Sequence, residues 1–198
     1  EKGEIWITTY SGVCVLKQFP SESISYITEK EGLPVNGIAS VFIDKFQNVW
    51  FGAEKAGISK YKENGFNFLN DTNIQGLGYA TAIKEDKKGR LWIGTYNNGL
   101  LQYTPAEKDK PATIINFTKK EGLSENCVYS LNIDKEDRVW IGYQNRGISI
   151  LEVSNDGKNA EFKHYNESNG LPVGFIVSIM QDKEGSIWLG ALNNIWPG

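Results

Sequence analysis

The sequence predicts an all-β protein, a β-propeller segment of four to five four-stranded blades. Three observations lead to this expectation: a composition rich in glycine and aromatic residues, one Trp-containing motif that recurs along the chain, and a spacing that leaves room for four short strands per recurrence. Of 198 residues, 21 are Gly, six are Trp, nine are Tyr and nine are Phe. Aromatic side chains favour strands and glycine favours tight turns.

The charge balance and hydropathy exclude several classes of protein. The formal net charge is −3, which argues against a nucleic-acid-binding surface, because such surfaces are usually basic. Hydrophobic residues make up 40% and charged residues 23%, values typical of a folded domain. No apolar run approaches the roughly 18–20 residues of a membrane span, so we expect no direct membrane contact by this segment.

The recurring motif is a short apolar stretch around a tryptophan. It occurs at Trp6, Trp50, Trp92, Trp140 and Trp188, so that the period lies between 42 and 48 residues. Six residues before the last four of these stands an aspartate: Asp44, Asp86, Asp134 and Asp182. A period of this length with several strands per unit is typical of propeller blades.

Each unit divides into four expected strands, A to D. Strand A is expected at 37–44, 79–86, 127–134 and 175–182, and strand B carries the Trp. Strand C is expected at 12–16, 57–61, 99–103 and 147–151, and strand D at 25–28, 66–68, 114–118 and 161–165. The leading fragment lacks strand A, and the last unit lacks strands C and D. We therefore expect one segment over 1–198, with a fragment at 1–31, repeats at about 32–75, 76–121 and 122–169, and a partial repeat at 170–198.

The motif residues have expected structural roles. Each repeated Asp falls on an A–B turn, where it can accept hydrogen bonds from nearby backbone N–H groups. These carboxylates would lie on separate blades, so they do not predict paired-carboxylate catalysis. Strand B is apolar at consecutive positions, which predicts that both of its faces are covered. The glycine after strand B would let two backbones approach closely.

The repeats resemble the two-component-regulator propeller family. The resemblance rests on Glu-Gly-Leu-Pro-x-Asn (31–36), Asn-Gly-Leu-Leu-Gln-Tyr (98–103) and Asp-Lys-Glu-Gly-Ser-Ile-Trp-Leu-Gly (182–190). It implies a periplasmic sensor region of a bacterial hybrid two-component system, whose members sense oligosaccharides and signal to a histidine kinase outside this chain. It implies as partners an oligosaccharide and the other blades or domains of a larger protein. An arc of blades would also expose an apolar face at each end, which suggests a homodimer; the last strand A could alternatively join the leading fragment and close a small ring.

The loops at one end of the strands are the expected ligand site. The D–A and B–C connections open on this face and are rich in Tyr, Asn, Gln and Arg. Aromatic rings can stack on sugar C–H surfaces, amides can bridge hydroxyls, and Arg can bind a sulfate or uronate. The candidate ligand-binding residues are Tyr96, Asn97, Tyr143, Asn145 and Arg146.

We expect no catalytic residues, no metal and no cofactor. His164, the single histidine, is expected to be a surface or packing residue of strand D, and Cys14 and Cys127 are expected to be buried free thiols. Two alternatives stay open. One is a propeller enzyme acting on polysaccharide, a lyase or glycosidase, and the other is a protein–protein interaction scaffold.

Overall fold

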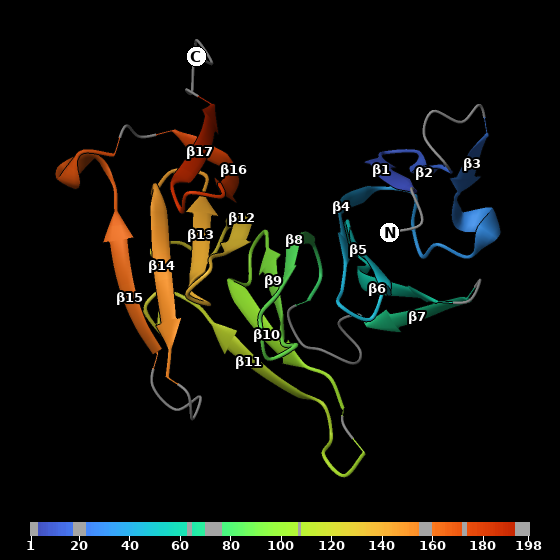
Figure 1. Cartoon of the computed structure of the whole chain (residues 1–198), viewed down its shortest axis with the longest axis horizontal. Helices are drawn as coiled ribbons and strands as arrows, with labels where there is room; N and C mark the ends of the chain where they lie inside the picture. Colours follow the sequence, from blue (N-terminus) through green and yellow to red (C-terminus); the bar gives the residue numbers. More distant parts are fainter. Residues whose placement is uncertain are drawn as a thin grey trace. The chain divides into compact units, whose positions relative to one another are not determined.

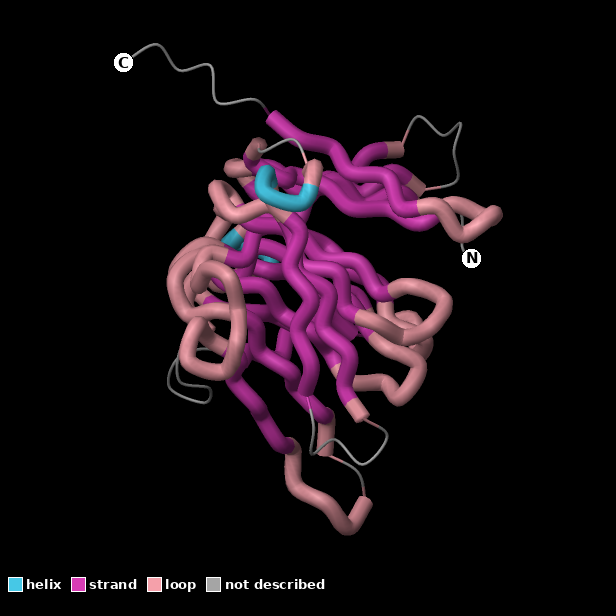
Figure 2. Tube along the Cα trace, turned by 90° about the vertical axis from the view of Figure 1, so that its left-hand side faces the viewer, coloured by secondary structure: helices cyan, strands magenta, loops and turns pink. Residues whose placement is uncertain are grey.

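The computed structural model describes residues 4–17, 23–62, 65–69, 77–106, 108–154, 160–171 and 174–192. Within these residues the chain is built of strands, with helix confined to two single 3₁₀ turns (Figures 1 and 2). The turns are η1 (Glu29–Glu31) and η2 (Glu167–Asn169). The strands are β1 (Ile5–Thr9), β2 (Gly12–Leu16), β3 (Ile24–Ile27), β4 (Ile38–Ile43), β5 (Val49–Ala53), β6 (Gly57–Lys62), β7 (Gly65–Leu69), β8 (Ala80–Glu85), β9 (Leu91–Thr95), β10 (Leu100–Thr104), β11 (Thr113–Phe117), β12 (Val128–Ile133), β13 (Val139–Tyr143), β14 (Ile148–Val153), β15 (Ala160–Tyr165), β16 (Phe175–Gln181) and β17 (Ile187–Leu192).

The strands form propeller blades, as the sequence predicts. Three sheets have four strands, in the orders β4-β5-β6-β7, β11-β10-β9-β8 and β12-β13-β14-β15. The leading fragment forms a three-stranded sheet, β1-β2-β3, and the last unit a two-stranded sheet, β16-β17. The predicted assignment of strands A to D is therefore confirmed for the described residues, where β1, β2 and β3 are strands B to D and β16 and β17 are strands A and B.

The chain divides into two compact units, residues Glu1–Ile83 and Lys84–Gly198. The expectation of one propeller segment over 1–198, with the repeat boundaries given above, stays a prediction.

The first unit has a core rich in aromatic rings. Phe51 of β5 is fully buried, and the ring of Trp6 in β1 lies 5.8 Å from it between centroids. Trp6 also lies 5.8 Å from Tyr61, which in turn lies 5.0 Å from Phe66. Val13 and Val15 of β2 complete the contact between the first two sheets. The buried residues of β5 confirm that strand B is covered on both faces.

The core of the second unit continues the same pattern from blade to blade. Trp92 of β9 is fully buried and stacks on Phe117 at 5.9 Å, and Phe117 meets the edge of Phe162 at 6.1 Å. Ile176 of β16 is buried against a cluster that includes Trp140. Large apolar side chains remain exposed at the last two strands, namely Met180, Trp188 and Leu192. The expected homodimer stays a prediction.

The repeated aspartate organises the A–B turn. Asp44 Oδ1 accepts hydrogen bonds from the backbone N–H groups of Phe46 (3.0 Å) and Asn48 (2.8 Å). Its Oδ2 accepts one from Trp50 Nε1 at 2.9 Å. Burial by itself would raise the pKa of Asp44, but the hydrogen bonds from Trp50 and Asn48 outweigh it and hold the pKa below its ordinary value. The carboxylate therefore links the backbone of the turn to the tryptophan indole. This link explains the six-residue spacing between the aspartate and the tryptophan.

The first Gly-Leu pair lies within the D–A connection between β3 and β4, directly after η1. Thr28 caps η1, and the Glu31 carboxylate accepts hydrogen bonds from Thr28 N (2.8 Å) and Thr28 Oγ1 (2.7 Å). Gly32 then adopts a left-handed conformation, with φ of 104°, and directs Leu33 into the core. Asn36 Oδ1 accepts the Glu29 N–H at 2.9 Å and closes the loop. The Glu-Gly-Leu-x-x-Asn pattern is therefore a local structural motif.

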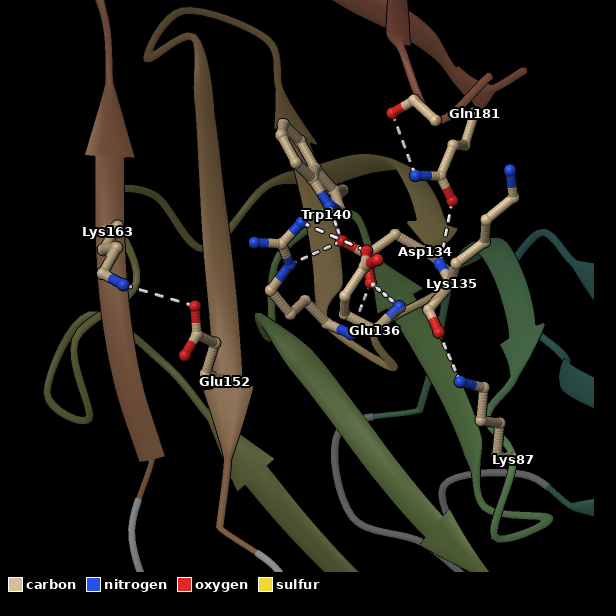
Figure 3. A network of polar contacts seen from close by, with 10 residues as sticks. Lys87, Asp134, Lys135, Glu136, Trp140, Glu152, Lys163 and Gln181 are labelled. Carbon is tan, nitrogen blue, oxygen red and sulfur yellow. Dashed lines mark hydrogen bonds and ion pairs between the residues drawn. The ribbon is translucent and has the colours of Figure 1, made fainter. Parts of the chain in front are cut away.

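Lysine side chains connect successive A–B turns of the second unit (Figure 3). Lys87 N donates to Asp137 Oδ1 at 2.9 Å. The Lys87 ammonium donates to the Lys135 carbonyl. Lys135 repeats the arrangement one blade further on: its N–H donates to Gln181 Oε1 at 2.8 Å (Figure 3). Its ammonium donates to the Lys183 carbonyl. These contacts lie 46 to 50 residues apart in the sequence and tie three blades together on the turn face.

Both cysteines are free thiols, as expected, although they are half-buried where full burial was predicted. Burial, together with the negative charge of Glu125, raises the pKa of Cys127 to about 11. Cys127 is therefore a weak nucleophile near neutral pH.

Candidate functional site

The candidate site lies where the B–C loops of the second unit follow strands β9 and β13. The first loop is a tight turn closed at its base. Thr95 N and Thr95 Oγ1 both donate to the Gly99 carbonyl, at 3.0 and 2.9 Å, and Asn98 N donates to Thr95 Oγ1 at 2.9 Å. This turn leaves Tyr96 and Asn97 exposed, with 43% of the Tyr96 surface accessible.

The second loop has the same construction. Tyr143 N donates to the Gly147 carbonyl at 3.0 Å, and Gly147 has a φ of 69°. A Cβ at this glycine would collide with the Tyr165 carbonyl oxygen, so the predicted close approach of two backbones is confirmed. Asn145 and Arg146 lie exposed at the tip.

The D–A connection over Ser124–Asn126 holds the two loops together. The Asn126 carbonyl accepts the Gly99 N–H at 2.9 Å, at the base of the first loop. A Glu125 carboxylate oxygen accepts the Asn145 N–H at 3.4 Å, within the second. Asn126 Oδ1 also accepts the Lys119 N–H at 2.9 Å, which fixes the connection itself. Four of the five candidate residues are thus exposed on loops that share one support.

The fifth candidate, Tyr143, requires a correction. Its side chain is fully buried, so its ring cannot stack on a ligand at the surface. The hydroxyl donates to Ser149 Oγ at 2.9 Å, and burial raises the pKa of Tyr143 strongly. The sequence pattern placed Tyr143 at the end of a strand but could not show that the side chain points inward. Tyr143 supports the loop from below.

A polar cluster beneath this face escaped the sequence reasoning. His164 lies exposed on β15, as expected, but its Nδ1 lies 2.7 Å from Ser149 Oγ and 2.9 Å from Ser124 Oγ. The Tyr143 hydroxyl donates to Ser149 Oγ, so the side chains of Tyr143, Ser149, His164 and Ser124 form one hydrogen-bonded cluster. One signal could have revealed the cluster: Ser124 stands where the other repeats have Pro34, Gly78 and Pro172.

The cluster is specific to one blade. At the equivalent position of the first full repeat, Ser59 pairs across the strands with Phe68, and its hydroxyl has no hydrogen-bond partner among the described residues. A blade therefore folds without this network, which in the β12–β15 blade links Ser124 of the D–A connection to β14 and β15.

The turn face carries the repeated carboxylates, and each is occupied by its own turn. Asp134 accepts hydrogen bonds from Trp140 Nε1 (2.7 Å) and from Arg138 N and Nε, at 2.8 and 2.6 Å. Burial opposes ionisation of Asp134, but these donors outweigh it and lower its pKa. The turn-capping prediction is confirmed.

No group of three or more His, Cys, Asp and Glu side chains among the described residues is placed to hold a metal ion. In the part of the chain that the structure describes, no helix is long and apolar enough to span a membrane.

Four-stranded antiparallel sheets, each with an Asp–Trp turn between its first two strands, identify the fold as that of a β-propeller built from sequence repeats. The family model described as two component regulator propeller matches residues 75–97, 122–145 and 170–193, so these three segments are similar to the repeats of that family. The resemblance given by the sequence motifs is thereby confirmed.

Solved structures resemble the chain over nearly all of its length. The extracellular domain of a protein assigned as a hybrid two component system from B. thetaiotaomicron has a TM-score of 0.80 and 25% identity, covering 98% of this chain and 26% of that one. A second extracellular domain from the same organism has a TM-score of 0.74 and 23% identity, covering 96% of this chain and 25% of that one. Virginiamycin B lyase from Staphylococcus aureus has a TM-score of 0.70 and 16% identity, covering 96% of this chain and 60% of that one. The last two likenesses show the fold alone. The chain spans about a quarter of the length of the first two structures. No curated protein matches it.

Proposed function

We propose that this chain is a non-catalytic segment of a periplasmic sensor propeller in a hybrid two-component system. It binds an oligosaccharide on the B–C loop face of the second unit, and the signal passes to a histidine kinase outside these residues. The family match and the likeness to extracellular domains of two-component systems support the sensor role and an extracytoplasmic location.

One observation carries the choice of site. The exposed side chains of Tyr96, Asn97, Asn145 and Arg146 project from two tight turns that are braced by one connection. Rigid loops lose little conformational entropy on binding, which favours them as a recognition surface. The aromatic ring offers a stacking surface, and the two amides and the guanidinium offer hydrogen bonds to hydroxyl or acidic groups.

The braced loops also suggest how binding could be transmitted. A ligand that contacts both turns would displace Glu125 and Asn126, which lie in the connection between successive blades. The Lys87 contacts on the turn face join these blades at their other end. A shift in blade packing would then reach neighbouring domains of the larger protein.

The likeness to virginiamycin B lyase supports a shared fold. It does not support a shared activity, because the identity is 16%. Among the described residues, the one histidine has its Nδ1 engaged by two serines, and the repeated Asp carboxylates are engaged by their turns. A polysaccharide lyase or glycosidase remains the alternative that a turnover assay tests.

The experiment is a binding titration of the purified chain against a panel of neutral, uronic-acid and sulfated oligosaccharides by calorimetry. We expect at least one of them to bind, and Tyr96→Ala and Arg146→Ala each to weaken it about tenfold, the effect of losing roughly 1.4 kcal/mol. Glu184→Ala is the matched control, because Glu184 lies exposed on an A–B turn at the opposite end of the strands. Equal binding by all variants would refute this site, and cleavage of the oligosaccharide would favour the enzyme. Capture of a protein partner with no glycan binding would favour the scaffold.

A further inference from the structure

The D–A connection that braces the candidate site reverses the charge of a repeated position. Three connections align along the sequence, at 28–36, 118–126 and 166–174. Their second residue is Glu29, Lys119 and Glu167, respectively. Lys119 and the residue after it, Lys120, both lie exposed. The connection at 118–126 therefore carries a pair of adjacent cations that neither of the other two has.

Lys119 gives up a hydrogen bond that the first connection makes. There, Glu29 N donates to Asn36 Oδ1 at 2.9 Å, and Glu29 Oε1 accepts the Asn36 N–H at 3.1 Å. In the connection at 118–126, Lys119 N donates to Asn126 Oδ1 at 2.9 Å, but a lysine side chain has no acceptor for the Asn126 N–H. The local fold therefore does not call for a lysine here, and recognition of a ligand accounts better for its positive charge.

The B–C loop held by this connection carries a third cation. Arg146 lies exposed at the tip of the loop. Neither Arg146 nor Lys119 forms an ion pair with another residue that the structure describes. The equivalent position is uncharged in the other described B–C loops, which have Ser11, Ala56 and Asn98 there. The positive charge is thus specific to the loop that the Lys119 connection braces.

The carboxylates of the same connection are already engaged. Glu121 accepts hydrogen bonds from Thr118 N (2.8 Å) and Thr118 Oγ1 (2.6 Å), which hold the pKa of Glu121 below its ordinary value. A Glu125 carboxylate oxygen accepts the Asn145 N–H at 3.4 Å. The connection and its loop therefore present more cations than carboxylates, and both carboxylates have hydrogen-bond donors of their own.

We propose that the loop face of the second unit recognises an anionic oligosaccharide, one that carries sulfate or carboxylate groups, through Lys119, Lys120 and Arg146. The inference rests on the proposed function, because it names the class of glycan for the same site. The Arg146 guanidinium can hold one anionic group by two parallel hydrogen bonds, and the two ammonium groups act as point charges for another. The exposed ring of Tyr96 offers a stacking surface for a sugar ring.

The test compares tetrasaccharides of different charge by calorimetry with the intact chain. Cellotetraose and xylotetraose are the neutral probes, tetragalacturonic acid carries carboxylates, and a chondroitin sulfate tetrasaccharide carries both carboxylate and sulfate. We expect at least one anionic probe to bind, and each neutral probe to bind at least about tenfold more weakly. Anionic binding should weaken between about 0.05 and about 0.5 M NaCl, because salt screens exposed charges. The two anionic probes distinguish a carboxylate ligand from a sulfate ligand.

Variants of the chain locate the charges. Lys119→Glu gives this connection the residue of the first one, and it should weaken anionic binding at least about tenfold. It should not lower the urea midpoint, because the new carboxylate can accept the Asn126 N–H as Glu29 accepts that of Asn36. Arg146→Gln should weaken anionic binding in the same way. Lys110→Glu is the matched charge reversal and should bind as the unaltered chain does, since Lys110 lies exposed between β10 and β11, at the opposite end of the strands.

The possible failures are distinguishable. Equal or tighter binding of a neutral probe that Tyr96→Ala weakens would refute the anionic class and leave the proposed function standing. Equal losses in Lys119→Glu and Lys110→Glu would refute this placement of the charges. Binding of neither anionic probe would overturn the inference, and the wider panel given under the proposed function then decides the glycan site separately.

Discussion

Removal of the Asp86 side chain should destabilise the second unit strongly. Asp86 is 4% exposed and accepts four hydrogen bonds, from Lys88 N (3.0 Å), Arg90 N (3.0 Å), Arg90 Nε (2.5 Å) and Trp92 Nε1 (2.9 Å). In Asp86→Ala the indole N–H stays fully buried without an acceptor. Breaking a buried charged pair costs about 3–5 kcal/mol. For a protein of this size, that loss lowers Tm by roughly 10 °C.

The assay is urea unfolding followed by circular dichroism, with tryptophan fluorescence as a second probe. Asp182→Ala is the matched control, because Asp182 makes the same contact to Trp188, which is 60% exposed. Water can satisfy that indole, so the control should lose much less stability. The double variant Asp86→Ala/Trp92→Phe should lose less stability than the sum of the two single variants. The reason is that the indole N–H, which Asp86→Ala leaves without an acceptor, is absent from the double variant. An equal loss in Asp86→Ala and Asp182→Ala would refute the argument from burial.

Three further outcomes are expected. The folded-state pKa values of Asp44 and Asp134 lie below the unfolded value of about 3.9. The stability that they contribute is therefore present above about pH 4 and is lost as pH falls through the lowered values; unchanged urea midpoints below pH 4 would contradict this. Gly147→Ala should cost more than Gly170→Ala, because an added Cβ collides with a carbonyl only at Gly147, while both positions have positive φ; urea midpoints compare them. Alkylation of Cys127, measured in a Cys14→Ser background, should accelerate about tenfold per pH unit between pH 8 and 10, since its pKa is about 11; a plateau by pH 9 would contradict it.

The sequence by itself determined the blades. The Asp–Trp contact, the burial of the continuous apolar strands and the turns at the positive-φ glycines all depend on groups within about fifty residues of one another. Most of them depend on groups within one turn. Asp44, for example, bonds to residues two, four and six positions away. Patterns of this range can be read from the sequence because the interacting groups are neighbours along the chain.

Only the tertiary structure decided which side chains of the loop face are accessible. Tyr143 and Tyr96 stand near each other in the repeat pattern, yet one is fully buried and the other 43% exposed. His164 meets Ser124 across 40 residues, and Lys135 meets Gln181 across 46. These contacts depend on how strands and blades pack, and the repeat motif is the same whether or not they form. Side-chain direction at a strand end and contacts between blades are set by three-dimensional packing, so the local pattern locates the loop face but does not select the residues that act on it.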